Sequence, residues 1–128
     1  MTVQAYMAGL PEFTRQAIVG LPSLSLTALG SSQTTGLALS TDFNVFTTVA
    51  SSTGCQLPWG VDGTVAGPVQ IGDSITVVNH GANTLSVYPQ SGGKIANGSA
   101  NAAFSVNATK LSEFTYIGGG NWAAAVSA

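Results

Sequence analysis

This sequence contains few charged residues. Only 6% of its 128 residues are charged, with a net charge of −2, whereas about 25% is usual in globular domains. Disordered chains combine low hydrophobicity with high net charge, but 45% of these residues are hydrophobic, so a folded chain is expected. Its surface must be covered by small polar residues and glycine, or by partners. Because strand edges without charged side chains tend to pair with other chains, low charge favours an oligomer.

The scarcity of basic residues excludes one class of partner. Arg15, Lys94 and Lys110 are the three basic residues, and they are too few and too scattered to neutralise a nucleic-acid backbone. Long apolar runs are absent as well, since no window approaches the ~18 consecutive apolar residues of a membrane span. The beginning of the chain also lacks the pattern of a secretory signal. We therefore expect neither nucleic acid nor a membrane as a partner.

Cysteine and histidine occur once each, which limits the chemistry available to the chain. Cys55 has no second cysteine to pair with and no nearby basic residue to lower its pKa, so we expect a small, partly buried apolar side chain. Cys55 and His80 lack the spacing of a metal site. Asp73 lies at the other end of a predicted strand from His80, too far away for a catalytic triad. We expect His80 to be solvated in a loop.

The acidic residues have structural explanations. Asp42 and Asp73 each stand just before a predicted strand, and Asp62-Gly63 has the pattern of a turn. Glu113 lies inside a predicted strand, where it faces solvent or pairs with Lys110. The sequence therefore predicts no catalytic residue, no metal site and no cofactor, and we expect that the protein is not an enzyme.

From Leu24 onward the sequence alternates with the two-residue period of β-strands. The expected strands are Leu24–Ala28, Phe43–Val49, Ile75–Asn79, Thr84–Tyr88, Ala103–Val106, Leu111–Ile117 and Trp122–Val126, with edge pieces at Val65 and Val69–Ile71. We expect two hairpins, one across His80–Asn83 and one across Gly118–Asn121. About eight strands separated by turns predict a single all-β domain, an antiparallel sandwich or barrel that includes the jelly roll among its forms.

The two predicted hairpins supply the expected core. Their inward-pointing side chains are predicted to be Val77, Leu85, Val87, Phe114 and Trp122. Trp59 lies in a segment rich in glycine and proline, where we expect it to act as a lid on this core. The alternative is an exposed contact residue.

Residues 1–23 are patterned differently and are predicted to be an N-terminal arm, with the β-domain at 24–128. Pro11 suits the first position of a short helix over Glu12–Val19, which Gly20 and Pro22 would end. Such a helix either caps the domain or docks on another molecule. Dense exposed apolar groups usually mark a contact surface, so the residues predicted to make assembly contacts are Tyr6, Met7, Leu10, Phe13 and Ile18.

Several stretches of the β-domain have a distinctive sequence pattern. They are Thr27–Gly30, Leu37–Asn44, Thr47–Val49, Gly72–Asn79, Gly81–Pro89, Asn101–Ala103, Phe114–Tyr116 and Trp122, and together they span about residues 24–126. In these stretches the chain resembles small β-rich virion proteins of tailed bacteriophages. Members of that family serve as head decoration (cement) proteins and as domains of head or tail fibres, and the resemblance carries over no enzymatic site.

The resemblance implies a structural protein of the virion. It would bind the exterior of the capsid as a homo-oligomer, a trimer rather than a dimer, after assembly in the host bacterial cytoplasm. Its partners would be the major capsid protein and other copies of itself, and it would bridge capsomers. The alternative is a fibre-type module that recognises a host surface glycan by stacking on Trp59, Tyr88 and Trp122. Against this, Tyr88 and Trp122 lie in or beside predicted strands, where aromatic side chains are more often core.

Overall fold

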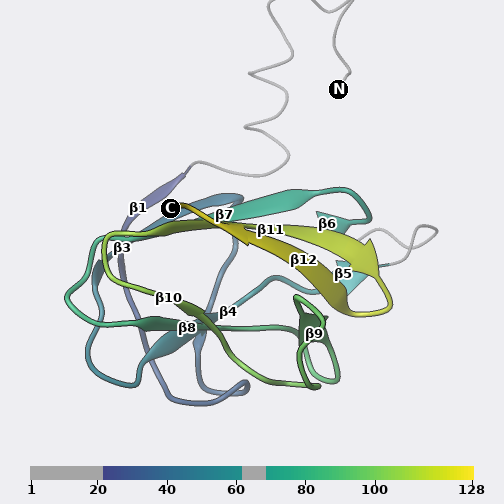
Figure 1. Ribbon diagram of the computed structural model, residues 1–128, viewed down its shortest axis with the longest axis horizontal. Coiled ribbons are helices and arrows are strands. Elements are labelled where there is room, and N and C mark those ends of the chain that lie inside the picture. The colour runs from purple at the N-terminus through teal and green to yellow at the C-terminus, as the bar shows by residue number, and fades with distance from the viewer. Residues whose placement is uncertain (1–21, 62–68) are drawn as a thin grey trace, which may run out of the picture.

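The computed structural model describes residues 22–61 and 69–128 (Figure 1). The predicted helix over 12–19, the predicted edge piece at Val65 and the turn at Asp62-Gly63 lie outside the described residues. The first strand begins at Ser23, one residue before the predicted start of the β-domain.

The described residues contain twelve strands and no helix. The strands are β1 (Ser23–Thr27), β2 (Leu37–Ala38), β3 (Phe43–Thr48), β4 (Gly54–Gln56), β5 (Gly60–Val61), β6 (Val69–Gln70), β7 (Ser74–Asn79), β8 (Leu85–Tyr88), β9 (Lys94–Ile95), β10 (Phe104–Val106), β11 (Leu111–Gly118) and β12 (Asn121–Val126). The all-β class is confirmed. The number exceeds the predicted eight because four of the strands have only two residues each, too short to give an alternating pattern.

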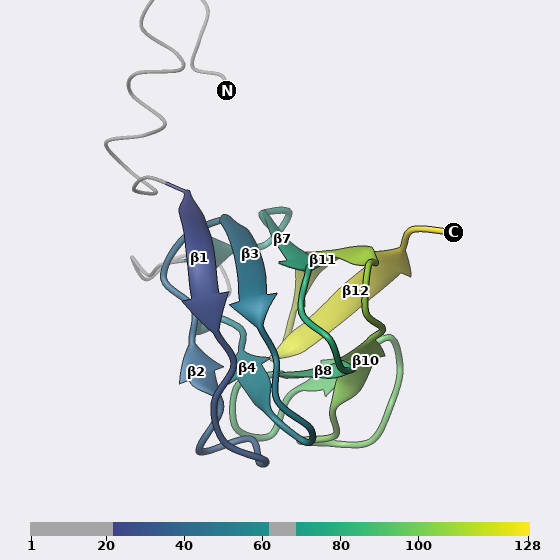
Figure 2. The same ribbon diagram turned by 90° about the vertical axis from the view of Figure 1, so that its left-hand side faces the viewer.

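The described strands form three sheets, of which two are large. The larger has six strands in the order β1-β3-β7-β11-β12-β9, and the second has four in the order β10-β8-β4-β2. The third is the small pair β5-β6. Figures 1 and 2 show the six-stranded sheet lying over the four-stranded one, with the chain passing repeatedly between them.

The prediction of an antiparallel fold is wrong, because the sheets are mixed. Six of the nine strand pairings are parallel, including those of β3 with β1 and β7. The reason lies in the path of the chain. From β1 to β4 and again from β7 to β11, successive strands enter the two larger sheets alternately. A strand that returns to a sheet after such a crossing can run in the same direction as its neighbour, as parallel pairing requires.

The predicted hairpin across His80–Asn83 is also wrong. Strand β7 belongs to the six-stranded sheet, whereas β8 belongs to the four-stranded sheet. The corner between them is held by the Asn79 side chain, whose Nδ2 donates to the carbonyl oxygens of Asn83 and Val106, both at 2.9 Å. Its Oδ1 accepts a hydrogen bond from the Gly81 amide at 2.9 Å. Three bonds to one buried amide therefore turn the chain from one sheet to the other.

The second predicted hairpin is confirmed. Strands β11 and β12 pair antiparallel, with Tyr116 opposite Trp122. Gly118, Gly119 and Gly120 all have positive φ angles, of 97°, 64° and 80°, which glycine adopts at little steric cost. The turn is therefore specified by local sequence.

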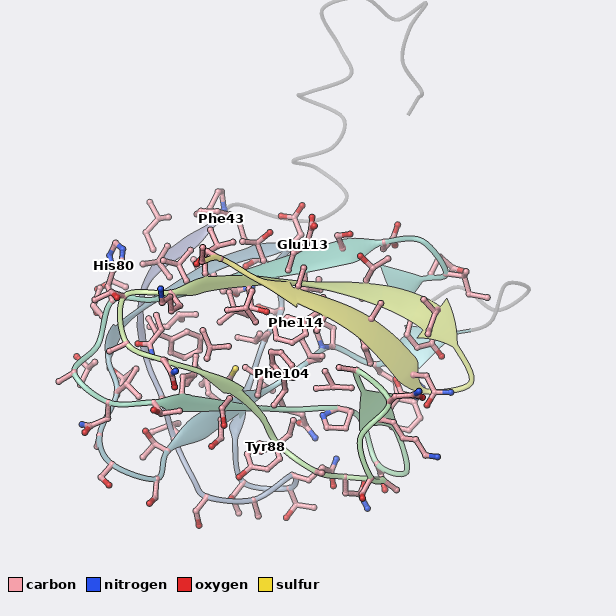
Figure 3. All side chains as sticks on the ribbon, viewed as in Figure 1. Phe43, His80, Tyr88, Phe104, Glu113 and Phe114 are labelled. Atoms are coloured by element: carbon pink, nitrogen blue, oxygen red, sulfur yellow. The ribbon has the colours of Figure 1, made fainter. Side chains whose placement is uncertain are left out.

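The core lies between the two larger sheets and contains all five predicted residues. Their exposed fractions are at most 1%. The rings of Phe104, on β10, and Phe114, on β11, meet edge to face at 5.5 Å between centroids (Figure 3). Tyr116 and Trp122 pack in the same way at 5.1 Å. Aromatic contacts of this geometry stabilise a core beyond the area they bury.

The core also holds polar side chains that the periodicity did not predict: Asn44, Asn79, Gln90 and Ser112. Asn44 Nδ2 donates to the carbonyl oxygens of Thr41 at 3.0 Å and Thr76 at 3.3 Å. Gln90 Oε1 accepts from the Gly60 amide at 2.7 Å, and Ser112 Oγ donates to a main-chain carbonyl of β12. Because each is hydrogen-bonded, their burial avoids the cost of an unpaired polar group.

Candidate interaction surface

The predicted assembly residues of the N-terminal arm cannot be placed on this fold. Tyr6, Met7, Leu10, Phe13 and Ile18 all precede residue 22 and lie outside the described residues. Their contacts stay a prediction.

The three aromatic residues considered for glycan stacking have different environments. Trp59 is 55% exposed, so its interpretation as a lid on the core is wrong. Trp122 is fully buried between the sheets. Tyr88 is half-buried on β8, where its ring lies over Gly54: a Cβ at Gly54 would come within 3.0 Å of the ring. Of the three, Trp59 is the one that presents most of its ring to solvent.

The residues considered for catalysis and metal binding stay apart. Cys55 is buried, and desolvation raises the pKa of its thiol far above the ordinary value. His80 and Asp73 are exposed at opposite ends of β7, and Asp73 Oδ2 accepts a hydrogen bond from the Gln70 amide at 2.9 Å, as expected of a turn residue. Within residues 22–61 and 69–128, His, Cys, Asp and Glu form no group of three that could hold a metal ion.

The described part of the chain holds no helix long and apolar enough to cross a membrane.

Glu113, the acidic residue inside a strand, faces solvent on β11. The Lys110 ammonium donates instead to the main-chain oxygen of Ala128. Among the described residues, none forms an ion pair with Glu113.

The outer face of the six-stranded sheet is turned away from the four-stranded sheet and is not covered by described strands. We define it by the outward-pointing side chains of the four central strands: Phe43, Val45, Thr47, Ser74, Thr76, Val78, Leu111, Glu113, Thr115, Ile117, Ala123 and Ala125. Figure 3 shows Phe43 and Glu113 on this side of the sheet and Phe114 on the other.

Strand register brings the apolar members of the outer face together. Val45 is opposite Val78 across β3 and β7, and Val78 is opposite Leu111 across β7 and β11. Phe43 lies in the next row, opposite Thr76, which is itself opposite Glu113. Phe43 is 37% exposed, Leu111 39% and Ile117 57%. The outer face is thus an apolar surface with hydroxyl groups and a single charge.

The edges of the two larger sheets are less suited to contacts than this face. Three of the four edge strands, β2, β9 and β10, have only two or three residues. The fourth, β1, has two register shifts in its pairing with β3, as β-bulges produce. Short edge strands and bulges both hinder pairing with another chain. These edges are therefore protected by geometry, although β1, β2 and β10 carry no charge.

Periodicity did not single out the outer face, because apolar residues occupy both sides of its strands. Phe43 and Phe46 point to opposite faces of β3, as Val77 and Val78 do on β7. The consecutive apolar residues in these strands could have revealed the outer face, because a strand with one face in water normally alternates apolar and polar residues.

Comparison with known proteins adds no relative: no family model, no curated protein and no solved structure matches this chain.

Proposed function

We propose that this protein is a structural component of a bacteriophage virion, which decorates and stabilises the outside of the capsid by oligomeric packing between capsomers. The observation that supports this proposal is the outer face: an exposed apolar surface with one charged residue, on a domain that has a separate buried core. A contiguous exposed apolar surface usually marks a site of contact with another molecule.

The partners in this proposal are the major capsid protein and further copies of the chain, with a trimer favoured over a dimer. Bound copies add buried surface between capsomers, and specific interfaces of this type bury about 1,200–2,000 Å². The N-terminal arm contributes apolar anchors at Tyr6, Met7, Leu10, Phe13 and Ile18. Because the edge strands are short or bulged, we expect copies to associate through sheet faces more than through pairing of edge strands. No catalytic step is needed.

We also propose that the two larger sheets form a closed two-layer sandwich rather than a barrel. Their separate strand orders and the side chains packed between them support this description. A buried core between two hydrogen-bonded sheets suits a protein that must hold neighbours in place.

Binding to capsids that lack decoration tests the proposal. The purified protein should co-sediment with such capsids and raise the temperature at which they release DNA. A variant with Phe43→Asp and Leu111→Asp should lose most of the binding, while Trp59→Asp, at an exposed residue that is not part of the outer face, serves as the matched control. Absence of the wild-type protein from the capsid fraction would contradict a decoration function.

The exposed ring of Trp59 supports a second candidate, the fibre-type module that binds a host glycan. Exposed tryptophan rings with one free side suit stacking against sugars. A glycan array with the wild-type protein and Trp59→Ala separates the two functions. Saturable binding to a glycan that disappears with Trp59→Ala, together with location on the tail, would favour the fibre module.

A further inference from the structure

We propose that the outer face of the six-stranded sheet is the acceptor for residues 1–21 of a second copy of this chain. The proposal rests on the proposed function in one respect, namely that the protein acts as a homo-oligomer. It assigns the surface and the occupant through which the copies associate.

The chemistry of the outer face limits which segment can cover it. Its apolar row of Val45, Val78 and Leu111 needs an apolar cover, and Glu113 lies beside that row on the same strand as Leu111. Covering an ionised carboxylate without a cation is costly, because the charge loses its hydration. The occupant must therefore be mainly apolar and must carry a positive charge.

The same face of a second copy does not meet this requirement. Strand β11 lies near the middle of the six-strand order, so two outer faces packed about a two-fold axis would bring two Glu113 carboxylates toward each other. Like charges in a poorly hydrated interface oppose association. Face-to-face pairing is thus disfavoured by the one charge that the outer face carries.

Residues 1–21 supply both an apolar cover and a cation. They contain the five large apolar residues named above, Arg15, which is one of the three basic residues of the chain, and one acidic residue, Glu12, so the contact requires Arg15 rather than Glu12 to face Glu113. The other two basic residues are less suitable partners for Glu113. Lys110 donates to the oxygen of Ala128, and Lys94 lies on the edge strand β9. Arg15 can pair with a carboxylate through two parallel hydrogen bonds.

The length of the segment is sufficient for this contact. Fully extended, 21 residues span about 70 Å, whereas the five spacings across six strands amount to about 24 Å. The segment can therefore leave its own domain and still cross the outer face of a neighbour.

A contact with the segment's own sheet would leave the protein a monomer, whereas a contact with a second copy makes it an oligomer. The mass of the protein in solution therefore separates the two acceptors.

A donor segment and an acceptor face on every copy can be exchanged reciprocally in a two-fold dimer, or passed from copy to copy in one direction. Contacts of the second kind close into a ring when the rotation between copies allows it. The arrangement is compatible with the predicted trimer and leaves no unpaired donor or acceptor in the closed ring.

The experiment uses two full-length variants that each destroy one half of the contact. Phe13→Asp disables the donor segment, and Phe43→Asp disables the acceptor face. By light scattering after size exclusion, each variant alone should be a monomer. An equimolar mixture should form a 1:1 heterodimer, because it contains one intact donor and one intact acceptor. Trp59→Asp, which alters neither half, should keep the mass of the wild-type oligomer.

A charge exchange sharpens the assignment of the pair. Arg15→Glu should weaken the association of copies about tenfold, and the double variant Arg15→Glu with Glu113→Arg should restore most of it. Circular dichroism melts of all variants establish that the β-domain is folded.

Three results would overturn the proposal: a mixture that stays monomeric, a Phe43→Asp variant that keeps the wild-type oligomer, or a wild-type monomer whose melting temperature falls with Phe13→Asp. The last would show that the segment covers its own sheet. Capsid co-sedimentation is read separately, so a protein that exchanges its segments but ignores capsids would contradict only the proposed function.

Discussion

The two faces of the six-stranded sheet differ less in hydrophobicity than in what lies against them. On β3, Phe46 is fully buried, whereas Phe43, three residues earlier, is 37% exposed. The inner face even contains two asparagines, Asn44 and Asn79, at 0% exposure. Burial in this domain is therefore decided by the position of the four-stranded sheet, and apolar side chains on the outer face are available for another molecule.

Substitution of the two phenylalanines of β3 tests the difference between the two faces most directly. Phe46→Ala should lower the free energy of unfolding by about 3–5 kcal/mol, because it leaves a cavity at a fully buried position. Phe43→Ala should lower it by less than about 1 kcal/mol under conditions where the protein is monomeric. Urea denaturation of both variants measures the difference. Similar losses for both would mean that the outer face is covered within the single chain.

The amide at the corner between β7 and β8 should give the next largest effect. Asn79→Ala leaves two carbonyl oxygens and the Gly81 amide without their partner. At 1–3 kcal/mol for each buried group left unpaired, and with partial relaxation, we expect a loss of about 2–4 kcal/mol. Asn107→Ala, at an exposed asparagine, is the matched control and should change stability by about 0.5 kcal/mol or less. Equal melting temperatures for the two variants would refute this function of the Asn79 side chain.

Cys55 should make stability depend on alkaline pH. Burial raises the pKa of its thiol in the folded state, whereas in the unfolded chain it titrates near the ordinary value of about 8.5. The folded state therefore retains a proton that the unfolded state loses, and stability falls as pH rises above about 8.5. The slope approaches about 1.4 kcal/mol per pH unit. Denaturation of the wild type and Cys55→Ala from pH 7.5 to 10 isolates this contribution, and parallel curves for the two proteins would contradict it.

Trp59 should give the smallest effect on stability. Since its ring is 55% exposed, Trp59→Ala should change the free energy of unfolding by about 0.5 kcal/mol or less. Trp122→Ala, at the buried tryptophan, should cost about 3–5 kcal/mol in the same assay. A large loss at Trp59 would restore its interpretation as a lid on the core.

Sequence reasoning succeeded where the deciding interactions are local. The β11–β12 hairpin follows from three consecutive glycines with positive φ angles. The inward direction of Val77, Leu85 and Val87 follows from alternation with the neighbouring side chains. These features need no knowledge of the other sheet.

It failed where residues distant in the sequence decide. The turn at His80–Asn83 has the composition of a hairpin, but a bond from Asn79 to Val106 directs the chain into the other sheet. Trp59 is exposed, whereas the next residue, Gly60, packs directly against the distant Tyr116 ring, where an added Cβ would come within 2.4 Å. Parallel neighbours and the outer face depend on such long-range contacts as well. The predicted arm contacts, from Tyr6 to Ile18, stay untested.

The pairing scheme also has a consequence for how the chain acquires its structure. Among the described strands, β11 and β12 are the only pair that is both consecutive in the chain and antiparallel. Most other pairings join segments far apart in sequence, and folds dominated by such pairings form slowly, in milliseconds to seconds. The six-stranded sheet depends on β11, which joins β7 to β12. On the ribosome, β1, β3 and β7 can pair as they emerge, but β7 keeps an unpaired edge until β11 follows, and the six-stranded sheet cannot be completed before then.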